Sequence, residues 1–507
     1  ELYRRAIALA GEPAPAALHE RLGEAYAAAG HGGEAAAAFL AAASGEGGVA
    51  AIDLRRRAAE HLLRSGRIDD GIALMDRVLA EAGLPPLGER RRPIAAVVAA
   101  RARLWWRRRR APGSAAPTPE LTLRLACCWS AVVGSSMVSP LRGAEFQARH
   151  LRLALDAGDP RRIALGLAFE AGGAAIVGPP AVRAHQILDE AARWAARVDE
   201  PIVRAYLDLA RGSVAFLCGD WPRALAHCDA CERTLREECV GAAWEVGTAQ
   251  RMSLTCLWHT GRIALLRERL RAALAEASQR NDIYAAIQMG TVLTPAVCLM
   301  DDRPDDAAEE LERAAGRIPR HGVTMLHWQH MQAQALVALY RGDAAAAAEL
   351  IARETPALRR GHLFRVRAVR VFTAYVEAAA VLGAAAVGGA GGGAAAYRQR
   401  ARAIQRSLRG PRGNPAAATL VAAELAVLDG DHDAARTAYR EAIAGFDAGH
   451  MSMVATAARW RLGELQGGDE GRALRDAARA LLVAEGIRDP ARAVGLFVPV
   501  GPSTRPR

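Results

Sequence analysis

Cysteine and histidine side chains gather at one place in the sequence in a pattern that resembles a metal site. His227 and Cys228 are followed by Cys231, and Cys218 and Cys239 lie on either side. A structural zinc site needs four ligands that converge tetrahedrally, and the second cysteine pair that usually completes one is missing. On a helix, residues three positions apart point to the same side. We therefore interpret Cys228 and Cys231 as core residues and not as ligands.

A second group of potential ligands consists of three histidines with methionines beside them. These residues are His321, His327 and His330, with Met325 and Met331. On a helix, His327 and His330 would lie one turn apart and could share a ligand. No Asp, Glu or Cys joins them at a metal-binding spacing. We interpret the group as the lining of a groove or a partly buried polar face, and we predict no metal and no cofactor in this chain.

Aromatic and basic residues stand together where Trp105 and Trp106 are followed by Arg107, Arg108, Arg109 and Arg110. Basic side chains beside aromatic rings can bind single-stranded nucleic acid or an anionic membrane surface. The interpretation that we adopt is the solvated end of a helix whose tryptophans pack inward, because no helix-turn-helix or zinc-finger pattern supports DNA binding. Nucleic-acid binding through residues 101–110 stays as the alternative, and the four arginines are candidate partner-binding residues.

A second basic cluster is the other candidate surface for a partner. It consists of Arg359, Arg360, Arg365, Arg367 and Arg370. On a helix that follows Gly361, the valines at 366, 369 and 376 would face inward, and Arg367 and Arg370 would face outward. Guanidinium groups match the geometry of carboxylates and phosphates. The cluster therefore predicts either a groove for an acidic peptide or a solvated helix face.

Lysine is absent from the chain, so all 66 basic residues are arginine. The phosphate loop of P-loop ATPases and the active site of protein kinases both need a lysine. Phosphoryl transfer of these two types is therefore excluded within these residues. No nucleophile elbow, zinc-protease motif or paired-carboxylate motif is present either, and we predict that this chain is not an enzyme. An enzyme with a dispersed active site is the alternative.

The composition predicts helices as the elements that position these residues. Of the 507 residues, 51% are hydrophobic but only 5% are aromatic, so most of the apolar content is Ala, Leu, Val and Ile. Ala and Leu favour helices because they lose little side-chain freedom there. The net charge of +11 is local, because residues 89–110 hold nine Arg and one Glu. An all-α protein with one basic stretch follows.

A repeat opens the chain and resembles the tetratricopeptide pattern. Its residues are Leu22, Gly23, Tyr26, Gly30, Ala35, Phe39 and Ala42. Gly23 and Ala35 are small where two helices would cross, and Tyr26 and Phe39 would fill the space between helices. Gly30 can take the left-handed conformation that ends the first helix.

The same turn recurs along the chain, at Gly66, Gly219, Gly261, Gly342 and Gly430, with Arg303 in the equivalent place. Positions 219, 261, 303 and 342 are 42, 42 and 39 residues apart. A small residue follows most turns by five positions, and Leu266 is the exception. The pattern predicts an α-solenoid of antiparallel helix pairs, each of which buries its apolar stripe only against its neighbours.

The chain divides by composition into six stretches. They are 1–87 (tetratricopeptide-like repeats), 88–120 (a basic Arg/Pro-rich connector), 121–382 (a helical repeat block), 383–396 (a flexible Gly/Ala-rich loop), 397–490 (C-terminal helical repeats) and 491–507 (a tail).

The cysteines and the apolar runs of the sequence bear on its compartment and on membrane insertion. Most of the eight cysteines lie in apolar helical runs, so we expect a reducing, cytoplasmic location. The longest apolar run, Leu125–Val138, is too short to span a bilayer. The first residue is Glu and not Met, which suggests a fragment or a processed end.

Several segments resemble the C-terminal region of bacterial, myxobacterial-type serine/threonine kinase–ATPase fusion proteins. The segments are residues 57–71, 129–134, 142–151, 461–465 and 486–492. The resemblance implies that catalysis lies upstream of Glu1 and that these repeats bind an effector or partner and regulate the catalytic parts. We therefore expect a non-catalytic interaction region whose partner is a protein or the catalytic domains of its own parent chain.

Overall fold

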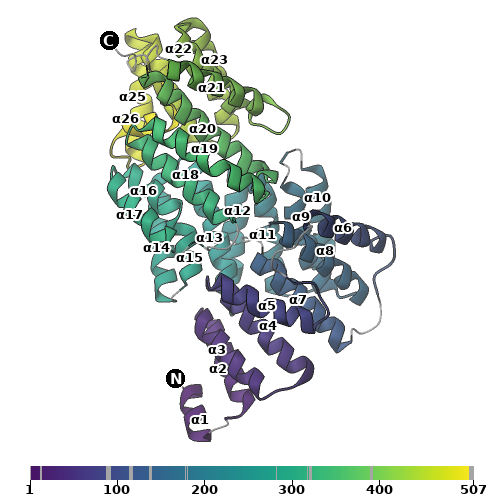
Figure 1. Ribbon diagram of the computed structural model, residues 1–507. Coiled ribbons are helices and arrows are strands. Elements are labelled where there is room, and N and C mark those ends of the chain that lie inside the picture. Colours follow the sequence, from purple (N-terminus) through teal and green to yellow (C-terminus); the bar gives the residue numbers. More distant parts are fainter. Residues whose placement is uncertain are drawn as a thin grey trace.

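The computed structural model describes residues 2–11, 14–86, 93–113, 118–135, 140–176, 178–179, 181–280, 282–316, 318, 323–388 and 392–501. Within these residues the regular structure is helical, with no strand. Successive helices pack against each other in antiparallel pairs, and the pairs stack from one end of the molecule to the other (Figure 1). The predicted all-α solenoid of helix pairs is therefore confirmed.

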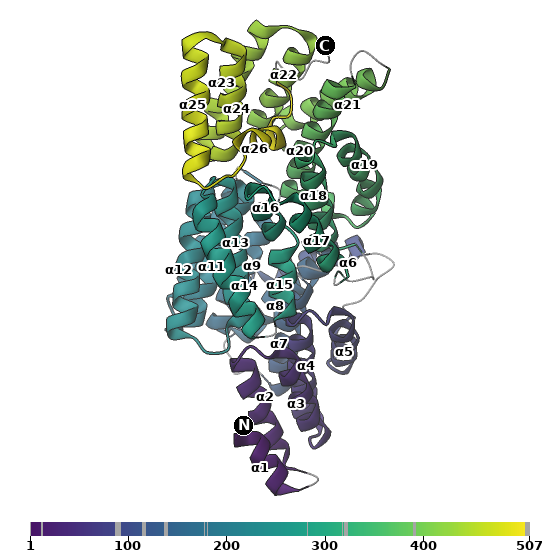
Figure 2. The same cartoon turned by 90° about the vertical axis from the view of Figure 1, so that its left-hand side faces the viewer.

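The N-terminal half of the described chain contains thirteen helices. They are α1 (Leu2–Ala10), α2 (Ala16–Ala28), α3 (Gly32–Ser44), α4 (Gly48–Arg64), α5 (Ile68–Glu81), α6 (Pro93–Arg107), α7 (Pro119–Ser135), α8 (Pro140–Ala157), α9 (Pro160–Ala175), α10 (Val182–Ala195), α11 (Pro201–Cys218), α12 (Trp221–Glu238) and α13 (Ala243–His259). The first three of them form one end of the molecule (Figure 2).

The C-terminal half continues in the same manner. Its helices are α14 (Ile263–Gln279), α15 (Ile283–Gly290), α16 (Leu293–Met300), α17 (Pro304–Ala315), α18 (Met325–Tyr340), α19 (Ala344–Arg360), the 3-10 turn η1 (Leu363–Arg365), α20 (Arg367–Val387), α21 (Gly392–Arg409), α22 (Pro415–Asp429), α23 (His432–Ala448), α24 (Ser452–Gln466), α25 (Gly468–Ala484) and α26 (Pro490–Phe497).

Local sequence signals set the ends of these helices. The side chains of Asp159, Asp220 and Asn414 each accept a hydrogen bond from a backbone N–H in the first turn, where a proline also stands. Proline fits there because the first N–H groups of a helix have no partner within it. Six predicted turn glycines take the left-handed conformation that ends a helix. They are Gly30, Gly66, Gly219, Gly261, Gly342 and Gly430.

Small residues stand where the helices of a pair cross. A Cβ atom on Gly23 would lie 2.7 Å from the ring of Phe39, and one on Gly71 would lie 2.7 Å from Leu63. Both contacts are shorter than carbon atoms allow. The predicted role of Gly23 and Phe39 at a helix crossing is therefore confirmed. Leu266, which departs from the small-residue pattern, is nevertheless completely buried.

One turn lies one residue earlier in the sequence than the repeat spacing predicts. We placed Arg303 at the position of the turn glycine, but Asp302 has the positive φ, at 54°, and Arg303 is the N-cap of α17. Aspartate tolerates this conformation better than most residues, and here its Oδ1 also lies 2.6 Å from Nη1 of Arg492. In the corrected frame the small residue is Ala307, which is fully buried.

Helices that are distant in sequence also contact each other, so the solenoid is wound tightly. Arg64 in α4 lies 3.2 Å from Glu245 in α13. The backbone N–H of Ala264 in α14 donates to Glu485, beyond the end of α25, at 3.0 Å. Arg488 donates its backbone N–H to the carbonyl of Met300 at 2.9 Å. The expectation that each pair packs only on its neighbours is therefore wrong.

The expected connector 88–120 contains helix α6, which packs on α8. Residues 87–92 and 114–117 lie outside the described part of the chain. The helix forms because its apolar residues recur with helical spacing, and Ala100 and Leu104 are buried in a core that extends from residue 35 to 214. Arg101 pairs with Glu170 of α9 and Arg107 pairs with Asp156 of α8, so this stretch is part of the fold.

The expected flexible loop 383–396 also differs from the structure. Residues 383–387 are the last turn of α20, and α21 begins at Gly392, while residues 389–391 lie outside the described part. Alanine keeps the helix regular here, and Gly383 permits a close approach: a Cβ on it would lie 2.9 Å from Ala344. The prediction of a flexible loop, which rested on the glycine content, is therefore wrong for the described residues of this stretch.

Most of α26 lies in the expected tail 491–507, and Val498, Val500 and Gly501 of the extended part that follows are buried. Arg461 donates to the carbonyl of Val498 at 2.9 Å, and Glu424 accepts from the N–H of Val500 at 3.0 Å. Residues 502–507 lie outside the described part. This buried segment runs across α22 and α24 and fixes α26 in place.

Helix α20 is, among the described residues, the one helix with the length and mean hydropathy (1.4) to cross a membrane. Of its most apolar stretch, 67% is buried. It packs against α18, α19, α21 and α22. Most of its apolar surface is therefore covered by the protein itself.

Candidate binding pocket

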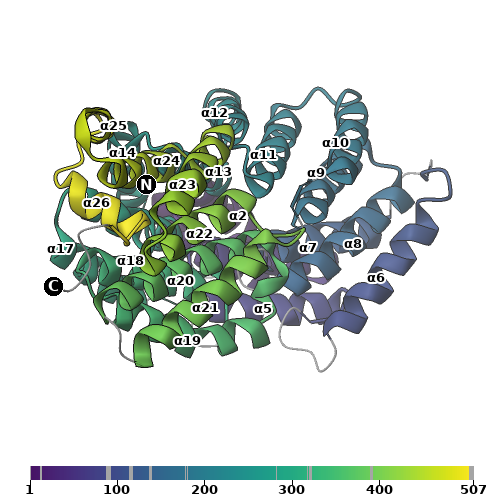
Figure 3. The same cartoon turned by 90° about the horizontal axis from the view of Figure 1, so that it is seen from above.

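A cavity of about 490 Å³ lies between helices of the middle and C-terminal parts of the solenoid. Figure 3 shows α9, α11 and α12 on one side of the molecule and α19–α21 on the other. Residues of α9, α11 and α13 form one wall, and residues of α18 and α20 form the opposite wall. Leu496 and Phe497 of α26 complete the lining. The tight winding of the solenoid therefore creates this pocket.

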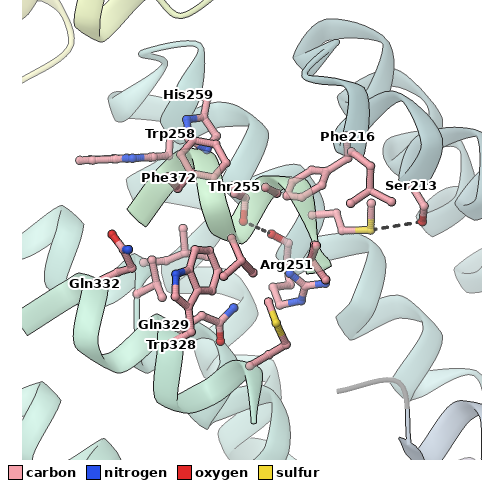
Figure 4. Close-up of a pocket in the computed structure, with 18 of the residues that line it drawn as sticks. Ser213, Phe216, Arg251, Thr255, Trp258, His259, Trp328, Gln329, Gln332 and Phe372 are labelled. Atoms are coloured by element: carbon pink, nitrogen blue, oxygen red, sulfur yellow. Dashed lines mark hydrogen bonds between the residues drawn. The ribbon is translucent and has the colours of Figure 1, made fainter. Parts of the chain in front are cut away.

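Aromatic side chains from different helices stand among the aliphatic residues of the lining. They include Phe169, Phe216, Trp258, Trp328 and Phe372. In the close-up, Phe216 of α11 faces the cavity from one side, and Trp328 of α18 faces it from the other (Figure 4). Aromatic rings give large apolar contact areas with little conformational freedom to lose. Such a wall is suited to holding an apolar group.

Two titratable groups of the pocket, His259 and Tyr206, are uncharged near neutral pH. The ring of His259 stacks on Trp221 and on Phe372, with centroid distances of 4.1 and 4.8 Å, and burial lowers its pKa to about 3. Burial, followed by the charge of Glu245, raises the pKa of Tyr206 well above its usual value. Neither group can exchange a proton efficiently near neutral pH, because a catalytic pKa must lie close to the working pH.

Most hydroxyl groups of the lining are bonded to their own helices. Ser213 donates to the carbonyl of Leu209 at 2.7 Å, and Thr255 donates to that of Arg251 at 2.8 Å. Opposite them, both Trp328 and Gln332 donate to the hydroxyl of Thr373, at 2.9 and 3.1 Å. These polar groups are therefore already satisfied and leave the wall effectively apolar.

Two glutamines of the lining depart from this rule. Gln288 in α15 is only 4% exposed, and neither its Nε2 nor its Oε1 has a hydrogen-bond partner within the described residues. The Oε1 of Gln329 in α18 is likewise buried without a partner there. Buried polar atoms are nearly always hydrogen-bonded in native proteins, so each exception needs an explanation. Both exceptions line the same pocket.

The predicted cysteine cluster is part of the core. Cys228 and Cys231 are completely buried, and the Sγ of Cys228 lies against Gly212. Burial raises the pKa of the Cys228 thiol to about 12, so this thiol stays protonated. The interpretation of these two cysteines as core residues is confirmed. Among the described residues there is also no group of three or more potential metal ligands.

The histidine cluster has structural roles where it is described, and His321 lies outside the described residues. Nδ1 of His327 accepts from the backbone N–H of Thr324 at 3.2 Å and so closes the first turn of α18. Nε2 of His330 lies 3.1 Å from the carbonyl of Leu311. Burial lowers the pKa of both histidines. The neighbouring Met325 lines the pocket.

The basic stretch at the end of α6 is largely engaged within the protein. Arg107 pairs with Asp156, Arg108 pairs with Glu190, and the guanidinium of Arg109 lies 3.5 Å from the ring centre of Trp105. Arg110 is exposed. Trp105 and Trp106 are 52% and 62% exposed, so the expectation that these tryptophans pack inward is wrong. They stay outside because Ala100 and Leu104 already occupy the buried face of α6.

The second basic cluster is divided by the structure. The side chains of Arg359, Arg360 and Arg365 are exposed at the end of α19 and in η1. Arg367 donates to the carbonyl of Gly413, and Arg370 donates to that of Phe364 at 3.0 Å. The last two are half-buried, so the expectation that they face outward is wrong. They turn inward because carbonyl groups of neighbouring turns lie within their reach.

Sequence reasoning did not find the pocket itself. Its lining extends from Ala168 to Phe497 and comes from at least eight separate elements. The one local signal was Gln288, a polar residue inside the apolar run that ends at Met300. That signal is shared by many partly buried helices, so the pocket follows only from the winding of the solenoid.

The comparisons with known proteins assign no family to this chain. No family model matches the sequence, and no curated protein matches it. Among solved structures, the chain is similar to the tetratricopeptide-repeat domain of P58(IPK), with 13% identity and a TM-score of 0.22. That match covers 93% of this chain and 99% of the other.

Proposed function

We propose that this chain is a non-catalytic interaction and regulatory region, which holds an occupant in its pocket and a protein partner on its surface. The observation that carries the proposal is the pocket itself. Its walls come from elements between α9 and α26, so an occupant contacts helix pairs that are far apart along the solenoid. Such an occupant stabilises one winding of the solenoid over others, because a ligand favours the state that it binds best.

The chemistry of the pocket supports binding over catalysis. His259 and Tyr206 have pKa values far from neutral pH, in opposite directions. The hydroxyls of Ser213 and Thr255 donate to helix carbonyls, and neither is hydrogen-bonded to a basic side chain within the described residues. A nucleophile needs an adjacent base or a lowered pKa to be activated.

For the protein partner we propose the exposed arginines Arg359, Arg360 and Arg365 as the contact surface. They lie together where α19 ends and η1 follows. The guanidinium of Arg359 lies 5.4 Å from the ring centre of Phe364, which holds it in place and leaves its N–H groups for carboxylates. An acidic segment of a partner protein matches this surface in charge.

The cellular context follows from the resemblance stated above. We propose that the region belongs to a bacterial signalling protein with serine/threonine kinase and ATPase modules, and that it acts in the cytoplasm. The partner would then be another signalling protein or the catalytic modules of the same parent. This part of the proposal rests on the resemblance alone.

Affinity capture tests the protein partner. The wild-type chain, a variant with Arg359, Arg360 and Arg365 changed to Glu, and a control variant are used as baits for a lysate of the source cells. The control carries the same change of charge at Arg233, Arg271 and Arg479, which are exposed on other helices. We expect one acidic protein, confirmed by binding of its purified form, to be retained by the wild type and the control and lost by the variant. Equal capture by all three baits would exclude this surface.

A further inference from the structure

We propose that the pocket binds a small amphipathic molecule with an apolar body and one uncharged polar head that both donates and accepts hydrogen bonds, as a primary amide does. This inference rests on the proposed function, because it names the class of the pocket's occupant. It is carried by the aromatic lining and by the unpartnered amide of Gln288.

The size and lining of the cavity fit a small molecule with an apolar body. Its volume of about 490 Å³ lies within the range of small-ligand sites, which are mostly apolar with a few placed polar groups. The aromatic rings of the two walls come from different helices, as Figure 4 shows for Phe216 and Trp328. An apolar body between these rings would contact both walls at once.

The unpartnered glutamine atoms define the head of the ligand. Nε2 and Oε1 of Gln288 and Oε1 of Gln329 are buried in the pocket wall without a partner, and rotation of these side chains toward a ligand would present one donor and two acceptors. A buried carboxamide without partners is costly, and a ligand that supplies both a donor and an acceptor removes that cost. A ketone lacks the donor, and a carboxylate lacks it as well. The carboxamide therefore selects a head that carries both.

An uncharged head is favoured over an anion. Arg251 is the one charged side chain among the residues that line the pocket, and it already has an interaction with another part of the protein. His259 is held neutral. A buried carboxylate needs a charged partner of its own, because the cost of removing a charge from water is large.

A peptide segment fits the pocket less well than a small molecule. Each residue of a peptide brings one backbone donor and one backbone acceptor that need partners once buried. The hydroxyls of Ser213, Thr248 and Thr255 are bonded to helix carbonyls, and Thr373 accepts from two neighbours. The polar groups that remain suffice for one head and not for a backbone.

Calorimetric titration with matched probes tests the inference. One series consists of octanamide, 2-nonanone and octanoate, which share an alkyl chain and differ in the head. The other consists of 2-naphthamide, 2-acetylnaphthalene and 2-naphthoate, which share an aromatic body. In at least one series we expect the amide to bind about tenfold more tightly than the ketone and the carboxylate, the value of one well-made hydrogen bond to a buried group. Equal affinity for the three heads, or no binding in either series, would overturn the inference.

Variants locate the contact. Gln288→Leu should remove the preference for the amide, because it weakens binding of the amide more than binding of the ketone, whereas Gln279→Leu, at the exposed last position of α14, should change neither affinity. Gln329→Leu gives a second test, with a smaller loss of preference, if the first variant is poorly folded by circular dichroism. An amide preference that survives both pocket variants would contradict the assignment. Capture of the protein partner, measured in parallel, shows separately whether the proposed function holds.

Discussion

Replacement of Gln288 by leucine should stabilise the protein, although it removes a residue of the proposed site. The Gln288 side chain is 4% exposed, and both of its polar atoms lack a hydrogen-bond partner within the described residues. A buried polar group without a partner costs about 1–3 kcal/mol. Leucine has a similar volume and no polar atom, so the free energy of unfolding should rise by about that amount.

Gln332 provides the matched control. It lies in the same pocket and is 7% exposed, but its Nε2 donates to Thr373 at 3.1 Å. Gln332→Leu removes a made hydrogen bond and should lower the free energy of unfolding by about 1 kcal/mol. The two substitutions are chemically identical, so they should shift stability in opposite directions only if the hydrogen bonding of the two glutamines differs as described.

Urea unfolding followed by circular dichroism measures the difference. A repeat protein of this length need not unfold in one step, so the midpoint of the transition that includes α13–α20 should be compared between variants. We expect a higher midpoint for Gln288→Leu than for the wild type and a lower midpoint for Gln332→Leu. A loss of stability in Gln288→Leu as large as that in Gln332→Leu would show that Gln288 has a partner in the folded protein, and the argument for the ligand head would fail.

Three further predictions concern other parts of the molecule. Burial raises the pKa of Glu424 from 4.5 to about 8. Between these two values the folded state binds a proton that the unfolded state has lost. The stability that this proton contributes should be complete below pH 4.5 and disappear as the pH rises through 8. Glu424→Gln should therefore flatten the dependence of the melting temperature on pH in that range, and an unchanged slope would contradict the assignment. Gly23→Ala places a Cβ 2.7 Å from Phe39 and should destabilise the first repeat by about 1–3 kcal/mol, measured by hydrogen exchange; wild-type protection of α2 and α3 would refute this. Because Arg107 and Arg108 are ion-paired, changing both to alanine should lower the melting temperature and leave any binding of single-stranded DNA in a mobility-shift assay unchanged, and a lost shift would instead favour the nucleic-acid alternative.

The fold was predictable because its determinants are local. A glycine such as Gly30 ends a helix because it adopts the left-handed backbone conformation. A small residue such as Gly23 marks the place where the two helices of one pair cross, and this contact does not depend on the packing of other pairs. The expectations that failed are those in which helix packing, and not local composition, decides the structure. Residues 383–387 are helical because the helix propensity of the alanines outweighs that of the single Gly383. The turn expected at Arg303 lies at Asp302 because aspartate can also adopt a positive φ.

The candidate site was not predictable for the opposite reason. Whether Phe169 and Phe372 face the same cavity depends on the small rotation between successive helix pairs, summed over many pairs. The second basic cluster shows the same limit, since Arg367 turns toward the carbonyl of Gly413 and Arg370 toward that of Phe364, in turns outside α20 that helix periodicity does not locate.

The part played by α26 has a consequence for the order in which the molecule can form. Phe169 and Phe497 both line the cavity, so during synthesis the ribosome completes one wall long before the residues that close it. A nascent chain therefore carries the aromatic surface of α9–α20 exposed until α26 emerges, and contacts between such distant segments form slowly. Chaperone binding during translation should be strongest in that interval, and it should end when the last helix docks.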